Sequence, residues 1–269
     1  MQLGNAKREA DLAQQGVVVV RRYLNDELAP RIRELDAVSQ KDGALVGFFL
    51  RVAAALQGLS RLDHPVDFQL ALAGNRMVLE SLVDAILISS DALSDGLRRL
   101  EYWELSAKLK AAEATVQYIS RKRGETGPPE QPLVEFIEEH KERLEASRLE
   151  LWPIRGKPGK GKHPNRWTGR DLLSDIREAD RLQGTELEEY YEIEYRRMNW
   201  NVHGSSLVGV RGLEFKILAV WFALAQRKLS EFALILADLT IRHVLGDEAA
   251  LREGMSQVKR KWQLAVVGR

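Results

Sequence analysis

The chain has 269 residues, which is enough for one large domain or two small ones with a sizeable core. Apolar residues make up 45% of the chain and charged residues 29%, as in an ordinary soluble globular protein, and the net charge of +1 argues against a chain-wide attraction to nucleic acid or membranes. The chain contains no cysteine, so disulfides, thiolate metal sites and cysteine nucleophiles are excluded.

The N-terminal segment does not predict an export signal. Residues 1–16 carry mixed charge and lack the apolar run of a signal peptide. The most apolar region, residues 217–239, is interrupted by Arg227, Lys228 and Glu231, and its charge-free part has only half the length that a bilayer requires. We therefore expect a cytoplasmic protein with no membrane partner.

Helical periodicity predicts an all-α protein. Apolar residues recur at helical spacing along the chain, while alternating strand patterns are nearly absent. The predicted helices cover residues 5–27, 42–61, 65–90, 97–122, 132–151, 169–182, 186–203, 212–245 and 247–264, of which 212–245 is either two helices or one kinked helix. We expect a single helical-bundle domain of about eight or nine helices. Its main domain covers residues 63–269, and N-terminal helices over residues 1–62 pack on it or mediate dimerisation.

Two predicted loops interrupt the helices. Residues 124–132, GETGPPEQP, contain consecutive prolines, which cannot continue a helix. Residues 153–169, PIRGKPGKGKHPNRWTG, combine glycine and proline with basic side chains and no acidic one, so we expect a mobile loop. Its basic residues are candidate contacts to a nucleic-acid backbone: Arg155, Lys157, Lys160, Lys162 and Arg166. The alternative is a solvated basic loop without a ligand.

The segment TELEEYYEIEYRRMNWNVHG, residues 185–204, carries the most informative pattern. Thr185 and Glu188 have the spacing of a capping box, and Gly204 fits a helix stop. One predicted face is apolar and consists of Leu187, Tyr191, Tyr195, Met198 and Val202. A polar line beside it consists of Glu192, Arg196, Asn199 and His203. This combination predicts either a functional site or a structural cluster.

A second polar line lies on the predicted helix 65–90, which is otherwise apolar almost all round. Arg76, Glu80 and Asp84 follow one another at intervals of one helical turn. Charges on such a helix need partners, because an unpaired buried charge is costly. We therefore expect Arg76 and Glu80 to lie within reach of helix 186–203. The polar line is either one wall of a functional cleft or a ladder of structural ion pairs.

Arg197 and His203 resemble a motif of the HEPN superfamily of helical ribonucleases and toxins, in which an arginine, four to six residues and a histidine follow one another. In that superfamily the two side chains act together on the RNA backbone, often at a dimer interface. The resemblance implies that His203 is an acid/base group and that Arg197 contacts phosphate. Helical geometry favours Arg196 over Arg197 as the partner on the same face as His203, and Asn199 lies on that face too.

A further resemblance covers roughly residues 65–245. The segments 75–88 and 166–206 are similar to an uncharacterised, mostly bacterial all-helical family. One helix of that family carries Arg-x-x-x-Glu, and a later region reads Trp, a short helix, Tyr-x-x-x-Tyr-Arg and Val-His-Gly-Ser. The matching residues are Arg76, Glu80, Trp167, Tyr191, Tyr195, Arg196, His203 and Ser205. The resemblance implies the all-helical fold and these residues' importance, without implying an activity.

The sequence predicts neither a metal site nor a cofactor, since the five histidines are scattered and none belongs to an HExxH motif. The functional prediction is a HEPN-like, RNA-directed protein, in its sharper form a metal-independent ribonuclease of a defence or toxin system. Its supporting residues are Arg76, Glu80, Glu192 and Tyr195. The alternative is a non-enzymatic helical interaction module with a structural Arg/Glu/His cluster. Either protein could act as a homodimer.

Overall fold

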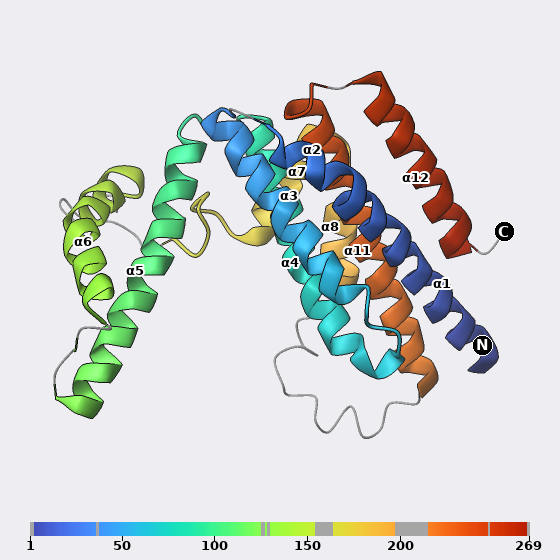
Figure 1. Cartoon of the computed structure of the whole chain (residues 1–269), viewed down its shortest axis with the longest axis horizontal. Helices are drawn as coiled ribbons and strands as arrows, with labels where there is room; N and C mark the ends of the chain where they lie inside the picture. Colours follow the sequence, from blue (N-terminus) through green and yellow to red (C-terminus); the bar gives the residue numbers. More distant parts are fainter. Residues whose placement is uncertain are drawn as a thin grey trace. The chain divides into compact units, whose positions relative to one another are not determined.

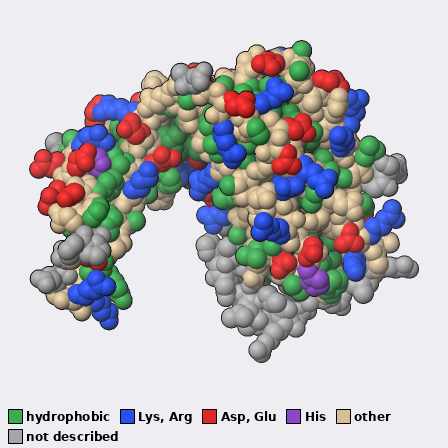
Figure 2. All heavy atoms as spheres, in the orientation of Figure 1, with side chains coloured by type: hydrophobic (Ala, Val, Ile, Leu, Met, Phe, Trp, Pro, Cys, Tyr) green, Lys and Arg blue, Asp and Glu red, His purple; other side chains and the backbone are tan. Residues whose placement is uncertain are grey.

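The computed structural model describes residues 3–35, 38–124, 127, 130–153, 164–196, 215–246 and 248–267. Over these ranges the protein is all-α, as predicted (Figure 1). The chain divides into two compact units, one formed by residues 1–90 and 176–269 and the other by residues 91–175. Basic and acidic side chains are interspersed over much of the face drawn in Figure 2.

The first unit is a helical bundle built around the long helix α11. Its α-helices are α1 (Leu3–Arg22), α2 (Ala29–Arg33), α3 (Gln40–Leu59), α4 (Phe68–Ser89), the short α8 (Leu187–Tyr190), α11 (Phe215–His243) and α12 (Ala249–Val267). The division between the units falls within α7 (Leu172–Gln183). Among its described residues, the first unit also contains two π-helical turns, η1 (Tyr23–Leu28) and η4 (Tyr191–Tyr195), and the 3-10 turn η2 (Pro65–Asp67).

Helix α11 contributes many buried side chains to the core, because other helices of the unit pack along it. Helices α1, α3, α4 and α12 all contact it, and Phe222, Leu229 and Leu236 are fully buried. The predicted segment 212–245 is thus a single α-helix over its described residues. The N-terminal helices take part in the same core, since α1 packs on α11 and α12 while α3 packs on α4.

The second unit contains the pair of long helices α5 (Gly96–Arg123) and α6 (Gln131–Leu151). Their shared core is small and consists of Tyr102, Leu109, Leu144, Leu151 and Trp152. Helix α5 ends where the sequence predicted, because Gly124 adopts a φ of 84°, a left-handed conformation that suits glycine and stops the helix. Pro132 then lies in the first turn of α6, where its missing N–H has no cost.

A buried carboxylate, Asp175, holds the residues before α7 in place. Its side chain is fully buried, and its Oδ2 accepts hydrogen bonds from Arg166 Nε at 2.7 Å and Thr168 Oγ1 at 2.7 Å. Arg170 Nε lies 3.3 Å from the other carboxylate oxygen. Trp167 is only 1% exposed. The end of the predicted 153–169 loop is therefore packed, and the Arg166 guanidinium is committed to a protein carboxylate.

One described helix, α3, is long and apolar enough to cross a membrane by length and composition alone. A core helix meets the same two criteria, and Leu45, Phe49 and Val52 on this helix are fully buried in the bundle. The finding is therefore only a weak indication of a membrane span.

Candidate functional site

Two helical segments bring together six side chains that we call the tyrosine–arginine cluster. Helix α4 contributes Arg76 and Glu80, and the segment formed by η4 and the residue after it contributes Tyr191, Glu192, Tyr195 and Arg196. All six are among the residues that the sequence marked as candidates. The structure thus unites the polar line of α4 with the segment that begins at residue 186.

The centre of the cluster is the carboxylate of Glu80. Its Oε1 accepts a hydrogen bond from Arg76 Nε at 2.9 Å and another from Tyr195 Oη at 3.0 Å. The predicted contact between α4 and the later helix is therefore confirmed. The side chains of Arg76 and Glu80 are 37% and 33% exposed, so these charges lie at the edge of the core and remain accessible to water.

Two stacked tyrosine rings form the aromatic part of the cluster. The rings of Tyr191 and Tyr195 are nearly parallel, with their centroids 4.7 Å apart and an interplanar angle of 21°. The Arg196 guanidinium carbon lies 5.9 Å from the centroid of the Tyr191 ring, and that of Arg76 lies 5.8 Å from the centroid of the Tyr195 ring. Each ring of the pair therefore has its own cation–π contact.

Arg196 is also paired with a carboxylate one helical turn earlier. Its Nη1 lies 3.0 Å from Glu192 Oε2, and its Nη2 donates to Oε1 at 3.2 Å. The Arg196 side chain is 60% exposed, so solvent screens this pair strongly. The cluster as a whole holds two guanidinium groups and two carboxylates, and its formal charges balance.

A buried hydrogen-bond chain fixes this segment against the core. Tyr190 Oη donates to Asn75 Oδ1 at 2.6 Å, and Asn75 Nδ2 donates to the carbonyl oxygen of Ala225 at 2.8 Å. Asn75 is fully buried, so each of these bonds replaces a bond to water. The sequence analysis missed both side chains, although a lone asparagine on an apolar helix was a visible signal.

The sequence placed Tyr191 on the apolar face of this helix, but in the structure Tyr190 takes the buried position instead. The buried side chains are those of Leu187, Tyr190 and Tyr195, which are 2%, 4% and 2% exposed, whereas Tyr191 is half-exposed. The cause is the π-helical turn η4 over residues 191–195, in which the hydrogen bonds span five residues instead of four. Tyr190 and Tyr195 are five residues apart and therefore share the face that packs on the core.

The predicted capping box is also replaced by another arrangement. Asp180, from the last turns of α7, accepts hydrogen bonds from the backbone N–H groups of Leu187 at 2.9 Å and Glu188 at 2.8 Å. Thr185 Oγ1 donates to the same carboxylate at 2.6 Å. A carboxylate binds free N–H groups at a helix start more strongly than a neutral hydroxyl does, and it suits the positive end of the helix dipole.

Burial keeps the hydroxyl groups of this region protonated. Burial and then the charge of Glu80 raise the pKa of Tyr195 above its ordinary value. Burial and then the charge of Glu194 raise the pKa of Tyr190. Both tyrosines thus act as hydrogen-bond donors at neutral pH. For Arg76, burial opposes the charge, but the hydrogen bond to Glu80 and the electrostatic effects of Tyr195, Glu80 and Tyr191 together outweigh it, and the pKa of Arg76 is raised.

Several predicted site residues lie outside the part of the chain that the structure describes. They are Arg197, Asn199, His203 and Ser205, together with the loop residues Arg155, Lys157, Lys160 and Lys162. Their predicted roles therefore stay predictions. Among the described residues, no group of three or more histidine, aspartate or glutamate side chains has an arrangement that would hold a metal ion.

A pocket of about 490 Å³ lies between the segment formed by α8 and η4 and the helix α11. Tyr190 and Phe232 contribute aromatic rings to it, and these rings meet edge to face with centroids 5.0 Å apart. Its remaining polar side chains are mainly carboxylates: Glu186, Glu189, Glu194 and Glu231. The sequence analysis did not predict this pocket, because its two walls are far apart in the chain.

Comparison with known proteins adds no relative: the chain matches no protein-family model, no curated protein and no solved structure.

Proposed function

We propose that the protein is RNA-directed and that its tyrosine–arginine cluster contacts single-stranded RNA. The observation that supports this proposal is the stacked pair Tyr191 and Tyr195, in which each ring also has a guanidinium group beside it. Proteins bind unpaired bases by stacking them on aromatic rings and on arginine planes. The half-exposed Tyr191 and the exposed Arg196 offer such surfaces to a base.

The more specific proposal is that the protein is a metal-independent ribonuclease. Arg196 lies on the surface immediately before the segment that carries Arg197, Asn199 and His203. In this mechanism Arg196 or Arg197 stabilises the charge that develops on the phosphate, Asn199 adds a hydrogen bond, and His203 transfers the proton. Arg76, Glu80, Glu192 and Tyr195 support the site by fixing the tyrosines and Arg196.

A second candidate is a non-enzymatic interaction module. It is favoured by the way Arg76, Glu80 and Tyr195 satisfy one another, because three mutually bonded side chains also serve a purely structural purpose. The balanced charge of the cluster points the same way, since RNA binding gains most of its affinity from an excess of positive charge. The two candidates differ in one measurable respect, the dependence of RNA binding on Tyr191.

The test measures RNA binding and cleavage with the full chain. Binding of a labelled single-stranded oligonucleotide is followed by fluorescence anisotropy for the wild type, Tyr191→Ala and the matched control Tyr118→Ala, whose side chain is 56% exposed on α5. Loss of one base–aromatic stack costs about 1–3 kcal/mol, so Tyr191→Ala should weaken binding by roughly 5- to 150-fold. The control should bind like the wild type.

Cleavage is measured on total RNA with His203→Ala. If the ribonuclease proposal is right, this variant loses cleavage, keeps its melting temperature and still binds RNA. A wild-type protein that binds RNA but leaves it intact would eliminate the ribonuclease and retain the RNA-directed protein. Absence of RNA binding by the wild type would leave the interaction module as the better description.

A further inference from the structure

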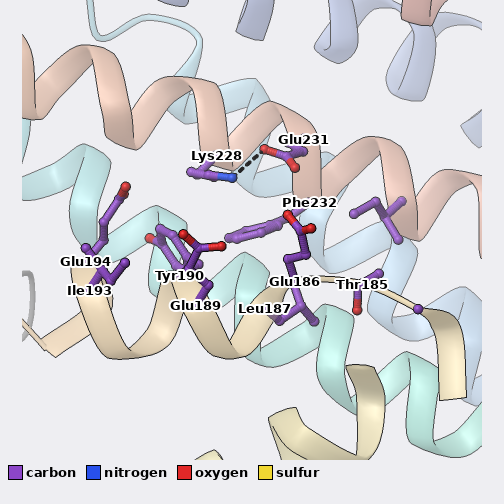
Figure 3. Close-up of a pocket in the computed structure, with 12 residues that line it drawn as sticks. Thr185, Glu186, Leu187, Glu189, Tyr190, Ile193, Glu194, Lys228, Glu231 and Phe232 are labelled. Carbon is purple, nitrogen blue, oxygen red and sulfur yellow. Dashed lines mark ion pairs between the residues drawn. The ribbon is translucent and has the colours of Figure 1, made fainter. Parts of the chain in front are cut away.

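The pocket between α8–η4 and α11 has two walls of different character. Figure 3 shows Lys228, Glu231 and Phe232 projecting from α11, with Tyr190, Glu189 and Glu194 on the facing segment. The aromatic rings line the space between the two walls, and the carboxylates surround it. A pocket of about 490 Å³ falls within the range of small-molecule sites.

The pocket already stabilises one ammonium group. Lys228 Nζ lies 2.9 Å from Glu231 Oε2 and 5.9 Å from the centroid of the Tyr190 ring. One cation is thus held by a carboxylate and by the face of an aromatic ring, which is the combination that recognises organic cations. The contacts of Lys228 therefore show that the side chains lining the pocket can bind an ammonium group.

The pocket is lined by more carboxylates than ammonium groups. Four glutamates line it, and Lys228 is the one cationic residue among its described lining residues. Two of the carboxylates, Glu186 and Glu189, are exposed at the rim. The charges of Glu194 and Glu231 also add to burial in raising the pKa of Tyr190, so the negative potential extends to the aromatic wall.

We propose that this pocket binds an alkylammonium ligand carrying more than one ammonium group. Its carboxylates come from both walls, which suits a flexible chain with charges at intervals better than a compact monovalent cation. The methylene groups of such a chain would pack against Phe232, Ile193 and Ile235. This inference concerns a separate site and does not depend on RNA binding.

The test uses isothermal titration calorimetry on the full chain with putrescine and spermidine, and with butanediol as the uncharged counterpart of putrescine. The wild type should bind spermidine more tightly than putrescine and should not bind butanediol. The double variant Glu186→Gln/Glu189→Gln should bind spermidine about tenfold more weakly. The matched control Glu248→Gln/Glu253→Gln removes the same charge from an exposed region near and on α12 and should change binding less than twofold.

A second variant tests the role of the resident lysine. Lys228→Met removes the competing ammonium from the Tyr190 ring and keeps the apolar stem, so spermidine binding should become several-fold tighter. Circular dichroism and a thermal melt check that each variant is folded. Equal losses in the pocket and control double variants would overturn the proposal, because they would show a non-specific charge effect. Absence of wild-type binding at millimolar spermidine would overturn it as well.

Two sources could supply such an ammonium group: a free polyamine or the lysine side chains of a partner protein. A blocked peptide with two lysines separates them in the same titration. Tighter binding of spermidine than of the peptide assigns the pocket to a free polyamine, and the reverse order assigns it to a lysine-bearing segment. Either assignment requires the loss of affinity in Glu186→Gln/Glu189→Gln.

Discussion

The Asp175 site of the second unit and the tyrosine–arginine cluster of the first both pair arginines with carboxylates, yet they differ in burial. The Asp175 carboxylate is fully buried and is contacted by two arginines and a threonine. The Glu80 carboxylate is one-third exposed and has one arginine and one tyrosine as partners.

The difference in burial predicts different contributions of the two sites to the stability of the protein. A fully buried charge must keep all its partners, because losing one leaves an uncompensated charge without water. A charge at the edge of the core can exchange a protein partner for water or a ligand at small cost. We therefore expect substitutions at the Asp175 site to lower stability more than substitutions in the tyrosine–arginine cluster.

The largest effect is expected from Asp175→Ala. The substitution leaves the Arg166 guanidinium, 12% exposed, facing a site without its counter-charge. Breaking a buried pair in this way costs about 3–5 kcal/mol. Urea unfolding should show the loss, and amide hydrogen exchange should accelerate in residues 164–172. The control Glu150→Gln breaks an exposed pair with Arg98 and should leave the urea midpoint unchanged. Equal stability of Asp175→Ala and the wild type would contradict the structural role.

Asn75→Ala tests the anchor beneath the tyrosine–arginine cluster. It removes the acceptor of Tyr190 Oη and the side-chain donor to the Ala225 carbonyl, so two buried hydrogen bonds are lost. At about 0.5–1.5 kcal/mol for each lost hydrogen bond, we expect a loss of about 1–3 kcal/mol in the free energy of unfolding. Tyr190→Phe removes only one of the two bonds and should cost less. If both variants melt at the wild-type temperature, the buried chain does not hold the segment.

Glu80→Ala should have a smaller effect than a buried ion pair would. The structure leaves a third of the Glu80 side chain and over a third of the Arg76 side chain exposed, so water can solvate Arg76 after the change. We expect a loss of about 1 kcal/mol, which corresponds to roughly 2–4 °C in melting temperature for a chain of this size. A drop as large as that of Asp175→Ala would show that the two sites are energetically alike.

The smallest effect on stability at neutral pH is expected from the ionisation of Tyr195, which changes the free energy of unfolding only at alkaline pH. Its folded-state pKa is raised above the ordinary value of 10.0, first by burial and then by the charge of Glu80. The stabilisation from this group is therefore complete below the unfolded pKa and is lost as the pH rises through the folded pKa. The free energy of unfolding, measured in urea at several pH values, should fall above pH 10 in the wild type.

Tyr195→Phe should reduce this alkaline slope, because the variant has no phenol at that position to ionise. The control Tyr118→Phe removes an exposed phenol and should keep the wild-type slope. Identical slopes in Tyr195→Phe and the wild type would show that the titration of Tyr195 is not linked to folding.

Most of the fold could be predicted from the sequence because helices are specified locally. The spacing of apolar residues located α3, α4, α5, α6 and α11 within a few residues of their observed bounds. Consecutive prolines and Gly124 marked the break between α5 and α6. The polar line on α4 also identified Arg76 and Glu80, because a charge on an apolar helix must find a partner.

Other features were decided only by the tertiary structure, because they depend on contacts between separate elements, which helical periodicity does not specify. The π-helical turn follows from packing Tyr190 and Tyr195 on the core together, and local periodicity does not contain that information. Asp180 replaced Thr185 as the capping group because the connection after α7 brings its carboxylate to the start of α8. Residues 166–170 are packed because Asp175 is buried beside them. The sequence alone determined which segments are helical. Contacts between the elements decided which face of each helix is buried and which charged side chains remain exposed to water.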